Sequence, residues 1–174
     1  MPLKLQPATP ADVPSLVELR NAVNQHLASQ FAGVLRASVV TEKGICFTMS
    51  RTTVLVAQYR GNPIATLALS TRKPWSIDTA YFSATDTPLY LTDMAVHPRR
   101  QRAGIGQQCI ALAAEYARRW PATAIRLDAY DADYGAGEFY RKCGFREVGR
   151  ASYRSTPLIY FELILPPVDS VSTD

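Results

Sequence analysis

A strand, a basic loop and two glycines at the start of a long helix constrain this chain more than any other feature. The apolar run 89–96 predicts a strand, and the amphipathic stretch 104–119, which stops before Pro121, predicts a helix. The connection between them carries three arginines, Arg99, Arg100 and Arg102. Gly104 and Gly106 allow close approach of the backbone to a ligand, and a helix N-terminus offers unpaired N–H groups. The stretch therefore predicts an anion site, most naturally for a pyrophosphate.

The remaining patterns predict one mixed α/β domain over residues 3–165, followed by a flexible tail over 166–174. In chain order we expect a strand at 3–6, a helix capped by Thr9, a second helix within 35–50, a hairpin of strands 53–59 and 64–69, an exposed loop with aromatic side chains over 71–88, a strand at 89–96, a helix at 104–119, a strand at 124–129, a short helix at 135–143, and strands at 146–154 and 158–165.

Composition excludes several classes of protein. The chain has 174 residues, of which 47% are hydrophobic and 20% charged, so it can bury a core and wholesale disorder is excluded. No apolar run approaches the roughly 18 residues of a membrane helix, and the N-terminus lacks a secretion signal. Its three cysteines form no CxxC pair, which argues against a disulfide framework or a zinc finger. We therefore expect a cytoplasmic protein. The net charge of +4 suits a phosphate-bearing partner without demanding one.

Two other interpretations of the glycine loop are weighed. The first is a plain helix start with surface arginines. The second is a dinucleotide fold, because Gly104-x-Gly106-x-x-Cys109 is nearly GxGxxG and Asp128 lies about 20 residues further on. That fingerprint needs a third glycine where Cys109 stands, and a glycine turn tight against the strand, whereas this loop is long. A Walker loop is excluded because no Lys-Ser or Lys-Thr follows Gly106.

Two motifs resemble those of one enzyme family. The run V-x-P-x-x-Q-x-x-G-x-G at 96–106 resembles the acetyl-CoA motif of the GNAT superfamily of N-acetyltransferases, and 139–145 resembles its FYxKxGF signature. The resemblance implies a central, mostly antiparallel sheet flanked by helices, with a splayed strand pair that forms the acetyl-CoA cleft. It implies transfer of the acetyl group from acetyl-CoA to a primary amine by direct attack in a ternary complex.

The resemblance also implies which residues contact acetyl-CoA. Free backbone groups of the strand before the loop would pair with the pantetheine arm, and one amide there could stabilise the oxyanion. Amides of the loop would hold the pyrophosphate. Where the family often carries an asparagine that touches the cofactor, this chain has Asp133. The implied contacts are Met94, Ala95, Val96, Gln101, Arg102, Ala103, Gly104, Ile105, Gly106, Asp133 and Tyr140.

For the chemistry, the resemblance makes Tyr140 the general acid that protonates the departing thiolate, with Tyr134 in reserve. The base is harder to assign. Asp93 is the only acid on the strand before the loop, and it is our candidate as base or amine ligand. Strict alternation puts Tyr90, Thr92 and Met94 on one face and Asp93 on the other, so Asp93 would need a bulge to re-aim it or would be structural.

The acceptor remains open between a small amine, an amino-acid derivative, an antibiotic and a protein amine. Aromatic side chains around the loop suggest an apolar wall for it, and two acids could hold a positive charge: Trp75, Tyr81, Phe82, Tyr90, Asp78 and Asp86. We expect no metal, no nucleic-acid partner and no membrane, and leave a homodimer open. Two alternatives are kept, a catalytically weak acyl-CoA sensor and a nucleic-acid binder using the basic loop.

Overall fold

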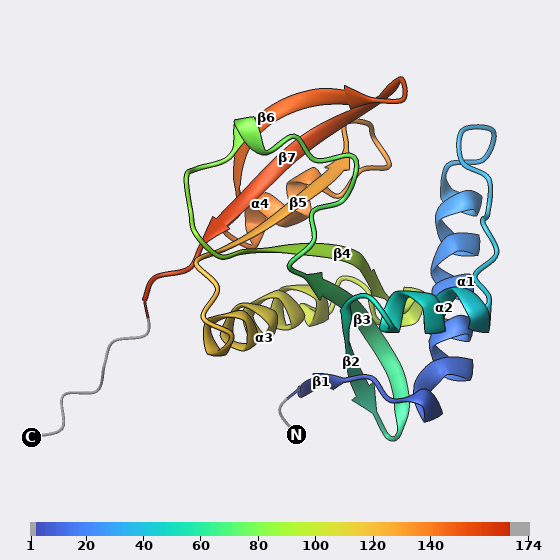
Figure 1. The fold of residues 1–174 in the computed structure, drawn as a ribbon. Helices are drawn as coiled ribbons and strands as arrows, with labels where there is room; N and C mark the ends of the chain where they lie inside the picture. The colour runs from blue at the N-terminus through green and yellow to red at the C-terminus, as the bar shows by residue number, and fades with distance from the viewer. Residues whose placement is uncertain (1–2, 168–174) are drawn as a thin grey trace, which may run out of the picture.

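A computed structural model describes residues 3–167 (Figure 1). The element order is that predicted from the sequence. The elements are β1 (Leu5–Pro7), α1 (Val13–Gln30), α2 (Glu42–Met49), β2 (Thr53–Tyr59), β3 (Asn62–Ser70), β4 (Pro88–Val96), α3 (Ile105–Arg119), β5 (Ala124–Tyr130), α4 (Gly137–Lys142), β6 (Arg146–Tyr153) and β7 (Thr156–Ile164), with short 3-10 turns at Pro10–Asp12, Thr79–Tyr81 and Pro98–Arg100. Most of the tail expected over 166–174 lies outside the described residues.

Seven strands form one mixed sheet in the order β1-β2-β3-β4-β5-β7-β6. All neighbours are antiparallel except β4 and β5, which confirms the predicted fold class. The parallel pair holds only from Pro88 opposite Ala124 to Tyr90 opposite Arg126. Beyond that point β4 pairs only with β3 and β5 only with β7. We call this separation the strand gap; it divides the sheet into a half of β1–β4 and a half of β5–β7.

Each face of the sheet is covered differently on the two sides of the strand gap. On one face, α3 and α4 pack on the largest hydrophobic cluster, which includes Leu67, Leu91, Leu127 and Phe161. We call it the α3/α4 face. On the other, the α1/α2 face, Leu16, Leu19 and Val23 of α1 pack on Val56 and Ala95, and the loop 71–87 covers the second half (Figure 1).

The first helix begins as Thr9 predicts, through a capping box. The Thr9 backbone N–H donates to Asp12 Oδ2 at 2.7 Å and its hydroxyl to the same oxygen at 2.8 Å. This box closes the 3-10 turn Pro10–Asp12, from which α1 continues. The sequence signal therefore marks the start of the whole helical segment.

Most residues of the loop 71–87 are exposed, as the sequence predicts, but two of its apolar side chains are not. Ile77 and Phe82 are buried against Tyr90 and Tyr160. A buried ion pair holds the loop, because Arg126 Nε donates to Glu162 Oε1 at 3.0 Å and the Ser83 hydroxyl donates to Glu162 Oε2 at 2.7 Å. The two buried side chains and the buried ion pair thus anchor the loop to the core of the second half of the sheet.

Candidate active site

The strand gap leaves one edge of β4 without a strand partner. Its residues from Leu91 to Val96 pair with β3 alone, and this stretch contains Met94, Ala95 and Val96. The N-terminus of α3 lies beyond the end of β4, with Gly104 as its cap at φ +75°. A side chain at Gly104 would meet nothing closer than Gln108 at 3.9 Å, so the space above the helix start is open. An edge of free backbone and a helix N-terminus together suit an extended ligand that ends in an anion.

The basic loop is held by side chains of its own. Gln101 Nε2 donates to the carbonyl of Val96 at 3.0 Å, and His97 Nδ1 accepts from the backbone N–H of Arg99 at 3.2 Å. His97 is therefore a loop-building residue here. Arg100 stacks over the Tyr59 ring at 4.5 Å. The guanidinium groups of Arg99 and Arg102 form no ion pair or hydrogen bond within residues 3–167, which leaves both available to an anion.

The two halves of the sheet meet at Gly106. A Cβ atom there would lie 2.9 Å from the Phe139 ring of α4 and 3.6 Å from Val96 of β4. Phe139 thus packs across the strand gap onto the first turn of α3. The absence of a side chain at Gly106 permits this packing, in addition to the close approach of a ligand that the sequence predicts.

A β-bulge turns Asp93 toward the α1/α2 face. Thr66 pairs with Ala95 and Ala68 with Thr92, so Asp93 and Met94 together oppose the single residue Leu67. Asp93 takes the left-handed conformation at φ +56°. Strict alternation is therefore wrong beyond Thr92. Asp93 shares the face of Tyr90 and Thr92, while Met94 packs against the cluster on the α3/α4 face.

Arg20 of α1 holds this bulge. Its Nη2 lies 2.7 Å from Asp93 Oδ1, and its Nη1 donates to the carbonyl oxygen of Asp93 at 2.8 Å. Two bonds from one guanidinium satisfy a residue whose backbone has left the strand ladder. Arg20 is not among the site residues predicted from the sequence. The available signal was a charged residue one turn after the buried Leu16, on the helix stripe that faces the sheet.

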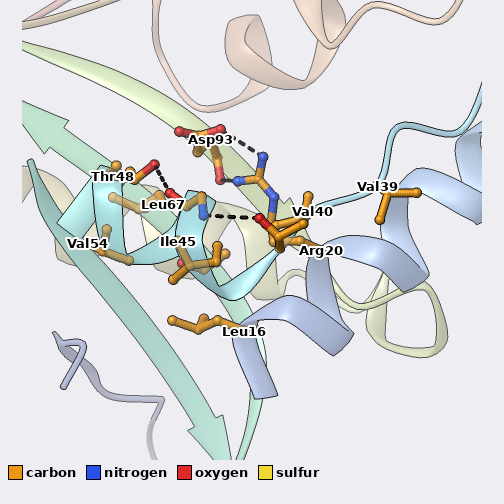
Figure 2. A pocket seen from close by; sticks show the side chains of 13 residues that line it. Leu16, Arg20, Val39, Val40, Ile45, Thr48, Val54, Leu67 and Asp93 are labelled. Atoms are coloured by element: carbon orange, nitrogen blue, oxygen red, sulfur yellow. Dashed lines mark hydrogen bonds and ion pairs between the residues drawn. The ribbon is translucent and has the colours of Figure 1, made fainter. Parts of the chain in front are cut away.

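A cavity of about 280 Å³ lies beside this pair, between α1, α2 and the sheet (Figure 2). Its lining is largely aliphatic: Leu16, Val39, Val40, Ile45, Val54, Leu67 and Ala68. Asp93 is the only acid in the lining, and Arg20 lies next to it. None of the eight residues of α2, which roofs the cavity, is fully buried. The cavity can therefore take an apolar group with a carboxylate at its β4 end.

Tyr140 of α4 lies on the opposite side of the sheet. Its ring is 7% exposed and packs edge-on against Phe139 and Phe145. Its hydroxyl makes no hydrogen bond to a described residue, yet no buried side-chain oxygen or nitrogen of residues 3–167 lacks a partner, so the hydroxyl keeps some contact with solvent. Burial raises the pKa of Tyr140, with smaller contributions from Cys143 and Asp128. The phenol is therefore protonated at neutral pH, as a general acid has to be.

The other predicted site residues of this region lie around the loop between β5 and α4. Asp133 is exposed, and Tyr134 packs edge-on against Phe31 beyond the end of α1, with ring centroids 6.0 Å apart. Cys143 is the C-cap of α4, and burial raises the pKa of its thiol.

The predicted aromatic wall is not one surface. Tyr81 is 43% exposed and packs edge-on against Tyr160. Phe82 and Tyr90 are buried in the cluster under the loop 71–87, so these two rings are core. Phe82 and Tyr90 are buried because the Tyr160 ring packs beneath the loop. Trp75 alone is freely displayed, at 88% exposed. Asp78 accepts from the backbone N–H of Ala80 at 3.0 Å, which caps the turn that follows.

Over residues 3–167 no helix is both long and apolar enough to cross a bilayer. In the same residues, no three His, Cys, Asp or Glu side chains gather in a way that could hold a metal ion.

Comparisons with known proteins agree with this geometry. A scan of protein families matches residues 21–145 to the acetyltransferase (GNAT) family. No curated protein matches the sequence. Many solved structures share the fold. The ribosomal-protein-S18-alanine N-acetyltransferase of Escherichia coli aligns with TM-score 0.69 at 14% identity, covering 97% of each chain.

Two further structures are similar over their whole length. The ribosomal-protein-alanine N-acetyltransferase of Brucella melitensis aligns with TM-score 0.69 at 20% identity, covering 94% of this chain and 100% of that one. The putative acetyltransferase yncA of Salmonella typhimurium, solved with acetyl-CoA, aligns with TM-score 0.67 at 17% identity over 100% of both. At these identities the structures establish the fold, and the family match covers well over half of the chain. The chain therefore belongs to the acetyltransferase (GNAT) family of acyltransferases.

Proposed function

We propose that this protein transfers the acetyl group of acetyl-CoA to a small primary amine by direct attack. The observation that carries the proposal is the strand gap, which leaves an unpaired β4 edge leading to the open helix start at Gly104. Such an edge suits the amide-containing pantetheine arm, and the helix start suits the pyrophosphate. Arg99 and Arg102, both free of protein partners among the described residues, would neutralise phosphate charge.

In this proposal the backbone amides near the bulge at Asp93 hold the thioester, and Tyr140 supplies the proton that the departing thiolate takes up. Asp133 is an exposed carboxylate, and its charge disfavours contact with an anionic partner, so we assign it no more than a backbone role. Turnover is favoured over a sensor role because the phenol of Tyr140 has no hydrogen-bond partner among residues 3–167 and is free to act.

We place the acceptor on the α1/α2 face. The cavity beneath α2 is lined by aliphatic side chains and by a single acid, so it suits an amine with a short apolar substituent better than a polycation, which would need several acids. The second oxygen of the Asp93 carboxylate accepts no hydrogen bond from a described residue and can orient the ammonium group. Asp93 is thus our proposed amine ligand.

The test is a thermal shift with acetyl-CoA followed by thiol release with a panel of amines. At 100 times its dissociation constant, acetyl-CoA should stabilise the fold by about 2.7 kcal/mol. Small aliphatic amines should release thiol faster than aminoglycosides or peptide N-termini. A shift with NAD and none with acetyl-CoA would contradict the proposal.

Gly104→Val and Gly33→Val form a matched pair for this test. Both glycines have positive φ and open surroundings, so both variants suffer similar backbone strain. Only Gly104 lies at the α3 start, and only that variant should lose acetyl-CoA affinity. Equal affinity in the two variants would show that the pyrophosphate does not bind at this loop.

A further inference from the structure

Asp128 lies at the strand gap on the same face as the proposed acceptor. It is two residues beyond Arg126, where the pairing of β4 with β5 ends. Its cross-strand partner on β7 is Tyr160, whose side chain packs under the loop 71–87, so Asp128 points to the α1/α2 face. Tyr140 lies on the α3/α4 face of the same half. The carboxylate and the phenol therefore flank the strand gap from opposite sides.

The carboxylate of Asp128 is available for chemistry in a way that the Asp93 carboxylate is not. Asp93 is paired with Arg20, whereas Asp128 has no ion-pair partner in the part of the chain that the structure describes. The one side-chain donor to Asp128 is the Ser76 hydroxyl, at 3.1 Å from Oδ1. Asp128 is partly buried, so it is sheltered from bulk water but still reachable. Trp75, next to Ser76, is exposed beside it.

We propose that Asp128 is the general base of the acetyl transfer, which rests on the proposed function. Asp128 takes one proton from the ammonium group of the acceptor, directly or through one water. The nitrogen lone pair then forms the C–N bond, and the C–S bond breaks with its electron pair on sulfur. Tyr140 gives its proton to that sulfur. Of the two protons still on nitrogen, one passes to the tyrosinate and restores Tyr140, and the other stays in the amide product. The proton held by Asp128 leaves to solvent.

The surroundings of Asp128 suit a base that works near neutral pH. Burial raises the pKa of Asp128, and the hydrogen bond from Ser76 partly opposes this. The other groups nearby are Tyr160 and Asp78, Tyr140 across the strand gap, and Arg126, which is committed to Glu162. The charge of Asp128 helps to raise the pKa of Tyr140, so the ionised base keeps the acid protonated. An acid whose proton is retained by a charged base across the reaction site is expected in general acid–base catalysis.

The experiment compares Asp128→Asn, Asp93→Asn and the control Glu115→Gln on the best small amine. Asp128→Asn should lower kcat by about 10²–10⁴-fold with acetyl-CoA affinity unchanged. It should also lose the limb of the pH–rate profile that rises above the ordinary aspartate pKa of about 3.9. Asp93→Asn should mainly raise KM for the amine. Glu115 is exposed on α3, far along the helix from Gly104, and its variant should behave as wild type.

A second variant separates catalysis from folding. Ser76→Ala removes the hydrogen bond that favours the charged carboxylate, so the acidic limb should move to higher pH while kcat on the plateau is retained. A pH profile unchanged in Ser76→Ala, or a normal kcat in a folded Asp128→Asn, overturns the role of Asp128 alone. Wild-type protein that binds acetyl-CoA but releases no thiol with any amine overturns the proposed function and this role together.

Discussion

The two halves of the sheet are covered in opposite ways on the α1/α2 face. Above the β1–β4 half, α1 packs on the sheet with buried side chains, yet none of the residues of the second helix, α2, is fully buried and a cavity remains beneath it. The β5–β7 half is covered by the loop 71–87, which has almost no regular structure but buries Ile77 and Phe82. Regular secondary structure therefore does not identify the rigid side here. Burial and satisfied polar contacts do.

This difference fits the roles that we propose, in which one half of the sheet binds the acceptor and the other half carries the acid and the base. A loosely packed roof can adapt to an acceptor, and the cavity beside Asp93 and Arg20 needs such a roof. The catalytic groups that we propose, Asp128 and Tyr140, belong to the tightly packed half. Preorganised acid and base groups need neighbours that do not move.

Arg126→Met, in the β5–β7 half, should cause the largest loss of stability. Arg126 and Glu162 are 5% and 0% exposed in their side chains, so removal of the cation leaves a buried carboxylate unpaired. We expect the free energy of unfolding to fall by about 3–5 kcal/mol in denaturant titrations.

The control for this variant is Arg146→Met. Arg146 is 71% exposed and lies 3.9 Å from the same carboxylate, so its loss should change stability by less than about 0.5 kcal/mol. Similar losses in both variants would mean that the loop is not held by the buried pair. Proteolysis within 71–87 should accelerate in Arg126→Met alone.

Sequence reasoning located most of the fold because most elements carry local signals. Thr9 and Pro121 mark helix ends, the 104–119 stripe marks a helix, and the two motifs place the loop and α4. The bulge at Asp93 has no such signal. Its cause is Arg20, which is 73 residues away in the chain. Alternation assumes an unbroken ladder, so it assigned Met94 and Asp93 to the wrong faces.

The Arg126–Glu162 pair was missed for a related reason. Each residue is a charge inside an apolar strand, which is a signal for a buried partner. The partner can be named only when β5 and β7 are known to be neighbours in register, where Arg126 lies opposite Glu162. Asp128 was noticed only as part of a dinucleotide fingerprint, because its place at the strand gap depends on that same register.

Ala68→Val tests whether the cavity in the β1–β4 half binds the acceptor. Ala68 lines the cavity from β3, and two added methyl groups would occupy space that we assign to the acceptor. KM for the best amine should rise by about tenfold, with acetyl-CoA affinity unchanged and stability equal or slightly higher. Ala111→Val on the exposed side of α3 is the control and should leave KM unaltered. An unaltered KM in Ala68→Val would remove the cavity from the acceptor site.

Asp128→Asn should change stability less than Arg126→Met does, and the sign of that change is informative. Burial raises the pKa of Asp128 in the folded protein above its unfolded value, so the folded state favours the protonated carboxyl. The wild-type protein therefore loses stability as the pH rises from about 4 through the folded pKa. The asparagine variant carries no charge and should escape this loss.

At pH 7 we thus expect Asp128→Asn to be more stable than wild type, by on the order of 0.5–2 kcal/mol, while its turnover falls. The two proteins should converge below about pH 4, where the carboxyl is protonated in both states. Glu162 is the internal contrast, since it is a buried carboxylate of the same half with a cation beside it. If Asp128→Asn is instead destabilised at pH 7, Asp128 is a structural carboxylate like Glu162, and the charge of Asp128 is not kept for catalysis.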